Sequence, residues 1–189
     1  MFQVFEAIAV VMALAYLILA ARENIWCWAC AFVSTAIYIV LFYSVSLLSE
    51  FLLNIFYLVM AVYGWWQWRR GGGGKTRSIQ SLSRTQHLSI ILLTGATVPL
   101  LAALTSAAGA AYPVLDATTT CFAVVTTFMV THKILENWLY WLAIDALSIY
   151  LFLAKELYFT AGLFALYLVI CVLGYQSWRR KMREEPVSG

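Results

Sequence analysis

Seven long apolar runs fill most of the chain, and their length constrains the fold more than any other feature. They cover residues 3–21, 25–44, 49–68, 87–108, 114–132, 137–154 and 158–178, with ends uncertain by a few residues. A run of about 18 or more apolar residues is long enough to cross a bilayer as a helix, which satisfies its own backbone groups in lipid. Because 63% of the 189 residues are hydrophobic and only 11% are charged, a soluble domain is excluded. The sequence therefore predicts an all-α, polytopic membrane protein with seven transmembrane helices.

One polar segment interrupts this pattern, RRGGGGKTRSIQSLSRTQ at residues 69–86. Its glycines and basic residues are typical of a flexible loop. With this loop placed in the cytoplasm, 11 of the 12 Lys and Arg residues fall on the cytoplasmic side and only Lys155 falls outside. Cytoplasmic loops carry an excess of Lys and Arg, so the sequence predicts an N-terminus outside the cell and a cytoplasmic C-terminus.

The two halves of the chain repeat. YLVMAVYGWWQWRR (57–70) matches YLVICVLGYQSWRR (167–180) at an offset of 110, and ENIWCW (23–28) matches ENWLYW (136–141) at an offset of 113. We assign the difference to a longer loop in the first half. Two three-helix units joined by one inverting helix give a 3+1+3 plan with parallel repeats, as in SWEET-like proteins. The predicted parts are a first repeat (1–70), a linker with the inverting helix (71–113), a second repeat (114–180) and a tail (181–189).

A stretch near the C-terminus, ENWLYWLAID (136–145), places polar side chains inside an apolar run. Spacing of i, i+4 and i+8 puts Asn137, Trp141 and Asp145 on one helix face, over about 12 Å of axis. A charge at this depth costs about 2.5–3.5 kcal/mol, so the face should meet other helices or a water-filled cavity. An amide and an indole suit a polar ring, which indicates a solute path. The alternatives are an interfacial belt for the tryptophan and a helix–helix hydrogen bond for Asp145.

Polar residues in other spans are further site candidates. Asn54 and Glu50 form an i, i+4 stripe that should face the bundle interior, and Tyr57 lies one turn from Asn54. Asp116 opens the fifth run, where a helix dipole favours an acid and capping is the simpler explanation. Tyr150 and Tyr167 are ring or hydroxyl partners for a solute, although membrane tyrosines are more often packing or belt residues.

Other polar residues indicate no further chemistry. Gln67 is expected to anchor at the membrane interface beside tryptophans, and His87 and His132 are expected at the solvent edge, with no partner nearby in the sequence. The sequence shows no zinc-type spacing of His and Cys and no nucleophile–base motif. We therefore expect no metal, no cofactor and no enzymatic activity.

The chain resembles the PnuC-type vitamin transporters over essentially its whole length. The segments that carry the resemblance are NIFYLVMAVYGWWQW (54–68), THKILENWLYW (131–141) and the two G-[WY]-x-x-W ends at residues 64–68 and 174–178. The resemblance implies a bacterial-type inner-membrane transporter for nicotinamide riboside, a homotrimer, a mid-membrane site and facilitated diffusion by alternating access. It also implies trapping of the riboside by a cytosolic kinase.

The resemblance assigns substrate contacts to Asn137 and Trp141. Asp145 departs from the neutral amide expected at its position in many nicotinamide riboside members, and at the offset of 113 its counterpart in the first repeat is Phe32. A carboxylate here suits ribose hydroxyls, a pyridinium charge or a different vitamin. Transport of thiamine, riboflavin or a deoxynucleoside, and a non-transporting binding or assembly subunit, remain the alternative functions.

Overall fold

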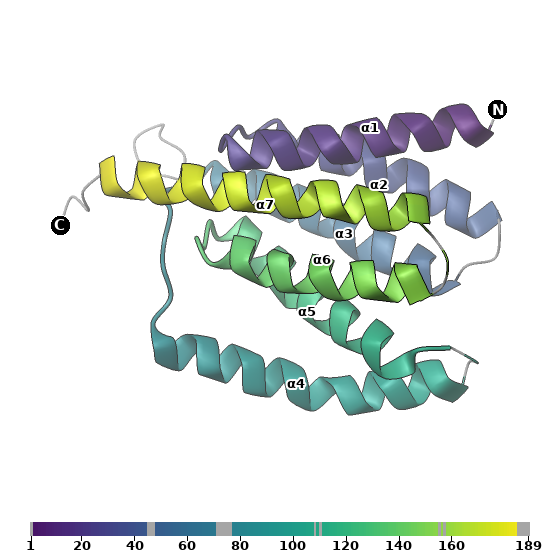
Figure 1. The fold of residues 1–189 in the computed structure, drawn as a ribbon. Coiled ribbons are helices and arrows are strands. Elements are labelled where there is room, and N and C mark those ends of the chain that lie inside the picture. The colour runs from purple at the N-terminus through teal and green to yellow at the C-terminus, as the bar shows by residue number, and fades with distance from the viewer. Residues whose placement is uncertain are drawn as a thin grey trace. The chain divides into compact units, whose positions relative to one another are not determined.

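The computed structural model describes residues 2–44, 48–70, 77–107, 109, 111–154, 156 and 158–184. These residues form seven helices in the order α1 (Phe2–Ala21), α2 (Cys27–Ser44), α3 (Leu48–Trp68), α4 (Arg84–Ala107), α5 (Pro113–Thr131), α6 (Asn137–Ala154) and α7 (Tyr158–Glu184) (Figure 1). The described part of the chain contains no β-strand, only an isolated bridge between Gln80 and Ile134. The all-helical prediction is confirmed. Its helix ends are correct within a few residues except at α7, which continues to Glu184.

Six of the helices in the described residues are long and apolar enough to cross a membrane, namely α1, α2, α4, α5, α6 and α7. The remaining helix, α3, carries the polar Asn54 and Gln67 and several aromatic residues near its end. The helices keep their backbone hydrogen bonds internal, which is the condition for crossing lipid. These features support a multi-pass membrane protein, and the full count of seven spans stays a prediction.

The chain divides into two compact units. The first holds α1, α2, α3, the turn residues Thr131–Lys133 and the end of α7 from Gln176. The second holds α4, most of α5, α6 and α7 up to Tyr175. Within the first unit, α2 packs against both α1 and α3. The division predicted from sequence, at residues 70, 113 and 180, stays a prediction.

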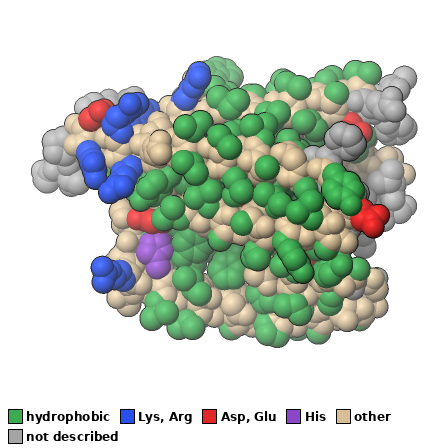
Figure 2. Space-filling model, in the orientation of Figure 1, with side chains coloured by type: hydrophobic (Ala, Val, Ile, Leu, Met, Phe, Trp, Pro, Cys, Tyr) green, Lys and Arg blue, Asp and Glu red, His purple; other side chains and the backbone are tan. Residues whose placement is uncertain are grey.

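The outer surface of the helices is apolar. Large hydrophobic side chains stand exposed on α1, α3 and α4, including Val4, Val62, Leu93 and Leu100. Figure 2 shows hydrophobic side chains along the helices, while Lys and Arg of the first unit gather where α1 and α7 end. Exposed apolar patches of this extent mark contact with a membrane or a partner protein, so the surface agrees with the composition.

The turns after α1 and after α5 have the same conformation. Glu23 and Lys133 both adopt positive φ, 57° and 53°. In each turn the next residue donates its backbone N–H to the carbonyl five residues earlier, at 2.9 Å (Asn24 to Leu19, and Ile134 to Met129). This bond and the left-handed residue define a Schellman motif, which ends a helix. The two turns are equivalent at an offset of 110.

Tryptophan–glycine contacts follow the same offset. Trp28 of α2 lies against Gly64 of α3, where an added Cβ would come within 2.4 Å of the indole. Trp138 of α6 lies against Gly174 of α7 in the same way, at 2.8 Å. Both tryptophans are 2% exposed. Each glycine therefore admits a buried indole, and no larger residue fits without displacing it.

The alignment of ENIWCW with ENWLYW at an offset of 113 is therefore wrong by three residues. The backbone turn and the Trp–Gly contact fix the register at 110, and no longer loop is needed in the first half. In this register Trp28 corresponds to Trp138, and Asp145 corresponds to Thr35 instead of Phe32. The letters E-N-x-x-x-W occur in both segments, but Glu23 is the positive-φ residue of its turn, whereas Glu136 lies three residues after the positive-φ residue Lys133. The parallel 3+1+3 arrangement itself stays a prediction.

Candidate functional site

The buried face of α6 carries polar side chains. Asn137, Asp145 and Ser148 are 0%, 4% and 6% exposed, and they share this face with Trp138, Ile144 and Leu151. Trp141 is half-buried. Burial on one face follows from helical spacing, as the sequence predicted for Asn137 and Asp145. The second unit therefore encloses an amide, a carboxylate and a hydroxyl along one helix.

Asn137 begins α6, and in the described part of the chain only one of the two polar groups of its side-chain amide has a hydrogen-bond partner. Its Nδ2 donates to the carbonyl of Ile134 at 2.6 Å, which closes the turn before the helix. Its Oδ1 is buried and has no hydrogen-bond partner among the described residues. A buried polar atom without a partner costs about 1–3 kcal/mol, so Oδ1 is available to a ligand donor or water. The turn before the helix therefore accounts for the Nδ2 group of this amide, and the Oδ1 atom has no partner among the described residues.

Asp145 contacts a thiol. The Sγ of Cys171 on α7 donates to Oδ2 at 3.6 Å, and Cys171 is 1% exposed. Among the described residues this is the one hydrogen bond that the carboxyl group accepts. A thiol is a weak donor, so the carboxyl group keeps most of its capacity to bind hydroxyl groups or a cation.

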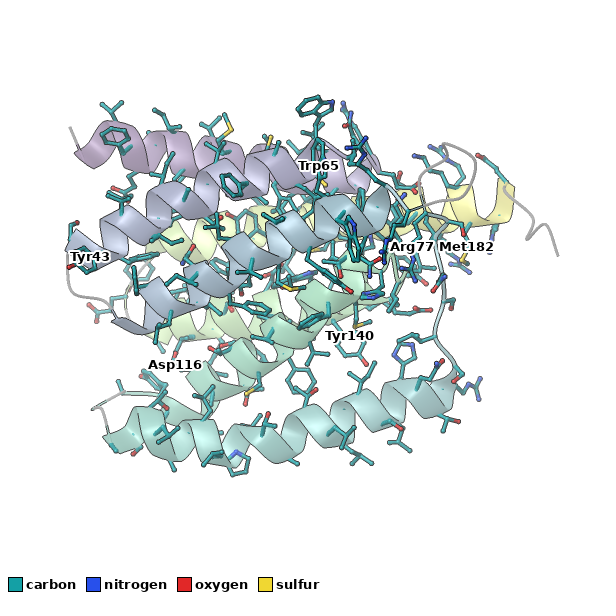
Figure 3. All side chains as sticks on the ribbon, turned by 180° about the vertical axis from the view of Figure 1, so that it is seen from behind. Tyr43, Trp65, Arg77, Asp116, Tyr140 and Met182 are labelled. Carbon is teal, nitrogen blue, oxygen red and sulfur yellow. The ribbon has the colours of Figure 1, made fainter. Side chains whose placement is uncertain are left out.

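The remaining candidates of the second unit lie outside this buried face. Tyr150 is 63% exposed on α6. Tyr167 on α7 is half-buried, and its ring lies 5.3 Å from that of Phe164. Asp116 is half-buried in the first turn of α5 (Figure 3), the position that its capping explanation requires. Their roles in a site stay predictions.

The candidates of the first unit lie on α3. Asn54 is 8% exposed, and Tyr57 is half-buried with its ring 5.6 Å from that of Phe56. The burial of Asn54 agrees with the prediction that its stripe with Glu50 faces the bundle interior. Glu50 belongs to the first turn of α3, and its side chain lies outside the described residues.

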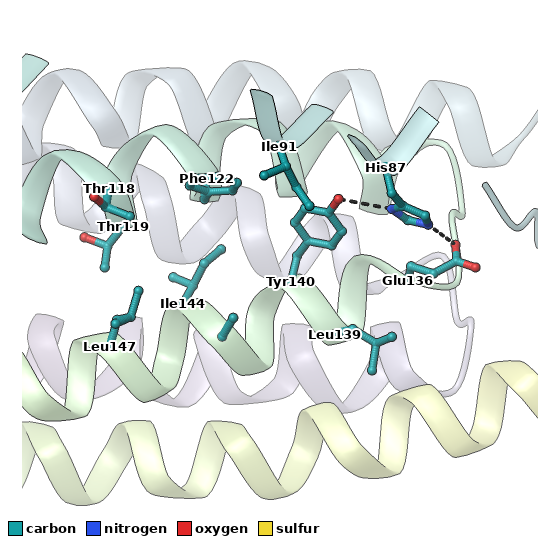
Figure 4. A pocket seen from close by; sticks show the side chains of 11 residues that line it. His87, Ile91, Thr118, Thr119, Phe122, Glu136, Leu139, Tyr140, Ile144 and Leu147 are labelled. Atoms are coloured by element: carbon teal, nitrogen blue, oxygen red, sulfur yellow. Dashed lines mark hydrogen bonds and ion pairs between the residues drawn. The ribbon is translucent and has the colours of Figure 1, made fainter. Parts of the chain in front are cut away.

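A separate groove opens among α4, α5 and α6 in the second unit. Its volume is about 540 Å³, within the usual range of ligand pockets. Its lining residues are His87, Ile91, Thr118, Thr119, Phe122, Glu136, Leu139, Tyr140, Ala143, Ile144 and Leu147 (Figure 4). The hydroxyl groups of Thr118 and Thr119 donate to carbonyls of their own helix. The groove thus offers an apolar surface, and Asp145 does not line it.

Polar groups gather at one end of the groove, around His87. Its Nδ1 lies 3.1 Å from the hydroxyl of Tyr140, and its Nε2 lies 4.0 Å from Glu136 Oε2. Glu136 also accepts hydrogen bonds from the hydroxyl of Ser81 and the backbone N–H of Leu82. His87 has no partner nearby in the sequence, and its contacts with Tyr140 and Glu136 form because the loop before α4 folds back onto the start of α6.

Sequence reasoning also missed a polar cluster in the first unit. Gln67 is 7% exposed and donates from Nε2 to the Tyr63 hydroxyl at 2.5 Å. His132 Nε2 lies 3.2 Å from the same amide nitrogen, and its Nδ1 lies 3.1 Å from the Thr131 hydroxyl. Gln67 is therefore not an interfacial anchor and His132 has partners. The i, i+4 spacing of Tyr63 and Gln67 was the available signal.

A buried ion pair joins the two equivalent turns. Lys133 is completely buried, with Nζ 2.8 Å from Glu23 Oε2 and 4.7 Å above the Trp68 ring. Glu23 Oε1 also forms an ion pair with Lys181 Nζ at 3.0 Å. From the sequence, Lys133 counted only as one of the positive charges that predict the orientation in the membrane. Glu23 and Lys133 lie 110 residues apart, at equivalent positions of the two repeats, and this offset was the only sequence feature that connects them.

Comparison with known proteins identifies the family. The family model described as "Nicotinamide mononucleotide transporter" matches residues 3–180. This chain belongs to that family. The match confirms the PnuC-type resemblance seen in the sequence.

Named relatives agree with the family. The chain is 23% identical over 206 residues to the nicotinamide riboside transporter PnuC of Escherichia coli (strain K12), which covers 95% of this chain and 86% of the relative. The Shigella flexneri protein of the same name gives the same values. A solved structure, "Crystal structure of the Vitamin B3 transporter PnuC", aligns with a TM-score of 0.77 and 19% identity over 96% of this chain and 83% of that one. The nicotinamide mononucleotide transporter family thus accounts for the fold of nearly the whole chain.

Proposed function

We propose that this member of the nicotinamide mononucleotide transporter family carries nicotinamide riboside across the cell's inner membrane. The family match over residues 3–180 is the observation that carries the proposal. The names of the Escherichia coli and Shigella flexneri relatives favour the riboside as the solute.

The substrate site in this proposal is the buried face of α6. Nicotinamide riboside has a positively charged pyridinium ring, a carboxamide and ribose hydroxyl groups. Asp145 supplies a carboxylate for the positive charge or the hydroxyls, and Asn137 Oδ1 is a buried acceptor without a partner among the described residues. Trp141 offers an indole face to a cationic ring, an interaction worth about 0.5–2 kcal/mol. The donors and acceptors of the solute therefore have counterparts on one helix.

The transport cycle in this proposal is facilitated diffusion by alternating access. Two three-helix repeats rock around a central site to which Asn54, Glu50 and Tyr57 contribute from α3, and Asp116, Tyr150 and Tyr167 contribute from the second repeat. The sequence has no phosphate-binding loop of the Walker type. Net uptake then follows the solute gradient, which a cytosolic kinase maintains by phosphorylating the riboside.

The assembly and orientation belong to the same proposal. The protein forms a homotrimer with its N-terminus outside and its C-terminus in the cytoplasm. The positive charge at the end of α7, from Arg179 to Arg183, supports this orientation because Lys and Arg favour the cytoplasmic side.

Uptake of labelled solutes into proteoliposomes tests the function. We expect the purified protein to equilibrate nicotinamide riboside across the membrane faster than empty vesicles, and to accumulate it when a riboside kinase and ATP are enclosed. Thiamine, riboflavin and a deoxynucleoside serve as competing solutes in the same vesicles. Selective flux of one of these would reassign the substrate. Binding of a solute without flux of any would contradict transport and favour a binding subunit.

A further inference from the structure

We propose that Cys171 is a positioning residue that holds the Asp145 carboxylate in place for a cationic solute. This inference rests on the proposed function, because it assigns a second helix to the same site. The thiol of Cys171 on α7 donates to Asp145 Oδ2 at 3.6 Å, and the two side chains are 1% and 4% exposed.

The packing of α6 on α7 fixes the geometry of this pair. One turn from Cys171, Gly174 lies directly against the buried indole of Trp138, with 2.8 Å between the indole and the position of an added Cβ. This contact admits little sliding of one helix along the other, because the tryptophan has no free space in which to move. The same packing therefore brings Sγ to Oδ2 and holds it there.

The pair is not a packing requirement of the repeat. At the offset of 110, the first unit has Thr35 and Ala61 where the second has Asp145 and Cys171. Ala61 is 2% exposed, and the Thr35 hydroxyl donates to the carbonyl of Ala31 within its own helix at 2.8 Å. The equivalent Trp–Gly contact forms in both units. The Trp–Gly packing is therefore common to both units, whereas the pair of Asp145 and Cys171 occurs only in the second.

The weakness of the thiol as a donor suits this role. A thiol is a weak hydrogen-bond donor, so it orients Oδ2 while leaving most of the carboxylate's hydrogen-bonding capacity to the solute. The other oxygen accepts no hydrogen bond from the described residues. It is thus free to meet a positive ring or a ribose hydroxyl.

Substitution of Cys171 tests the inference in proteoliposomes. Cys171→Ala should raise the KM for nicotinamide riboside about 2- to 10-fold, the effect of losing one hydrogen bond, with little change in maximal rate. Cys171→Ser should restore the wild-type KM within about 2-fold. The reduced form of the riboside is neutral, so the ratio of its KM to that of the cationic riboside measures the preference for charge. Cys171→Ala should lower this ratio.

Two controls separate positioning from packing. Cys121→Ala on α5 removes another free cysteine and should leave the KM unchanged. In an Asp145→Asn background, Cys171→Ala should have no further effect on the KM, because the carboxylate is already absent. Two results would overturn the role of Cys171. One is a Cys171→Ala protein with the wild-type KM, and the other is the same change in KM on adding Cys171→Ala to the wild type and to Asp145→Asn. Absence of flux in the wild type would instead overturn the proposed function.

Discussion

Replacing Asp145 by Asn should raise the KM for nicotinamide riboside about 10- to 100-fold while the folded protein is obtained in normal yield. The expected size is that of a hydrogen bond or ion contact to a charged group, about 1.5–3 kcal/mol. Asn keeps the volume of the side chain and can still accept a bond from Cys171, so packing of α6 on α7 is preserved. Initial uptake rates at varied solute concentration give the KM, and size-exclusion chromatography gives the yield and assembly.

Glu6→Gln is the matched control for this substitution. Glu6 is an exposed acid on α1, and its neutralisation should leave the KM unchanged. If Asp145→Asn abolishes assembly, Asp145 is a structural hydrogen-bonding residue. If it assembles and transports the riboside with the wild-type KM, the carboxylate has no part in binding.

Replacing Glu23 by Gln should lower the unfolding free energy by about 3–5 kcal/mol, the cost of leaving one member of a buried ion pair uncompensated. Lys133 is completely buried and its Nζ contacts Glu23 at 2.8 Å, so loss of the carboxylate strands a positive charge beside the Trp68 ring. Thermal unfolding of the purified protein in detergent measures the effect as a lower transition temperature.

Glu156→Gln provides the control, because Glu156 also has positive φ, 59°, and is exposed. It should change stability by less than about 0.5 kcal/mol. The double variant Glu23→Gln with Lys133→Met should be more stable than Glu23→Gln alone, since it removes the stranded charge as well. A Glu23→Gln protein as stable as Glu156→Gln would show that the pair does not hold the two turns together.

The helices were predictable because each depends on local composition. Apolar runs long enough for a bilayer, bounded by polar residues, gave α1 to α6 within a few residues. The end of α7 was not predictable in this way, since the apolar run ends at residue 178 and residues 181–189 were interpreted as a tail, although Lys181 belongs to the helix and pairs with Glu23. The repeat and its offset of 110 were visible between residues 57–70 and 167–180, but the match between 23–28 and 136–141 suggested a different offset. Schellman turns and Trp–Gly packing set the offset for the first segment of each repeat, and the turns depend on backbone conformation, which the residue letters do not show.

The part of the candidate site that lies on the single helix α6 was predictable from the sequence. Spacing along α6 placed Asn137 and Asp145 on one buried face, and their burial agrees with that. Contacts between helices could not be predicted from the sequence, in which neither Cys171 nor Lys133 stands out as a site or pairing residue. The contacts of His87 with Tyr140 and of His132 with Gln67 were not predictable, because the residues of each pair lie more than 50 positions apart in the chain.

A structure of this protein with nicotinamide riboside bound tests the location of the site most directly. The account predicts the pyridinium ring or the ribose in contact with Asp145 and Asn137 on the buried face of α6. Ligand density confined to the apolar groove lined by Phe122 and Leu147, with Asp145 still bonded only to Cys171, would contradict it.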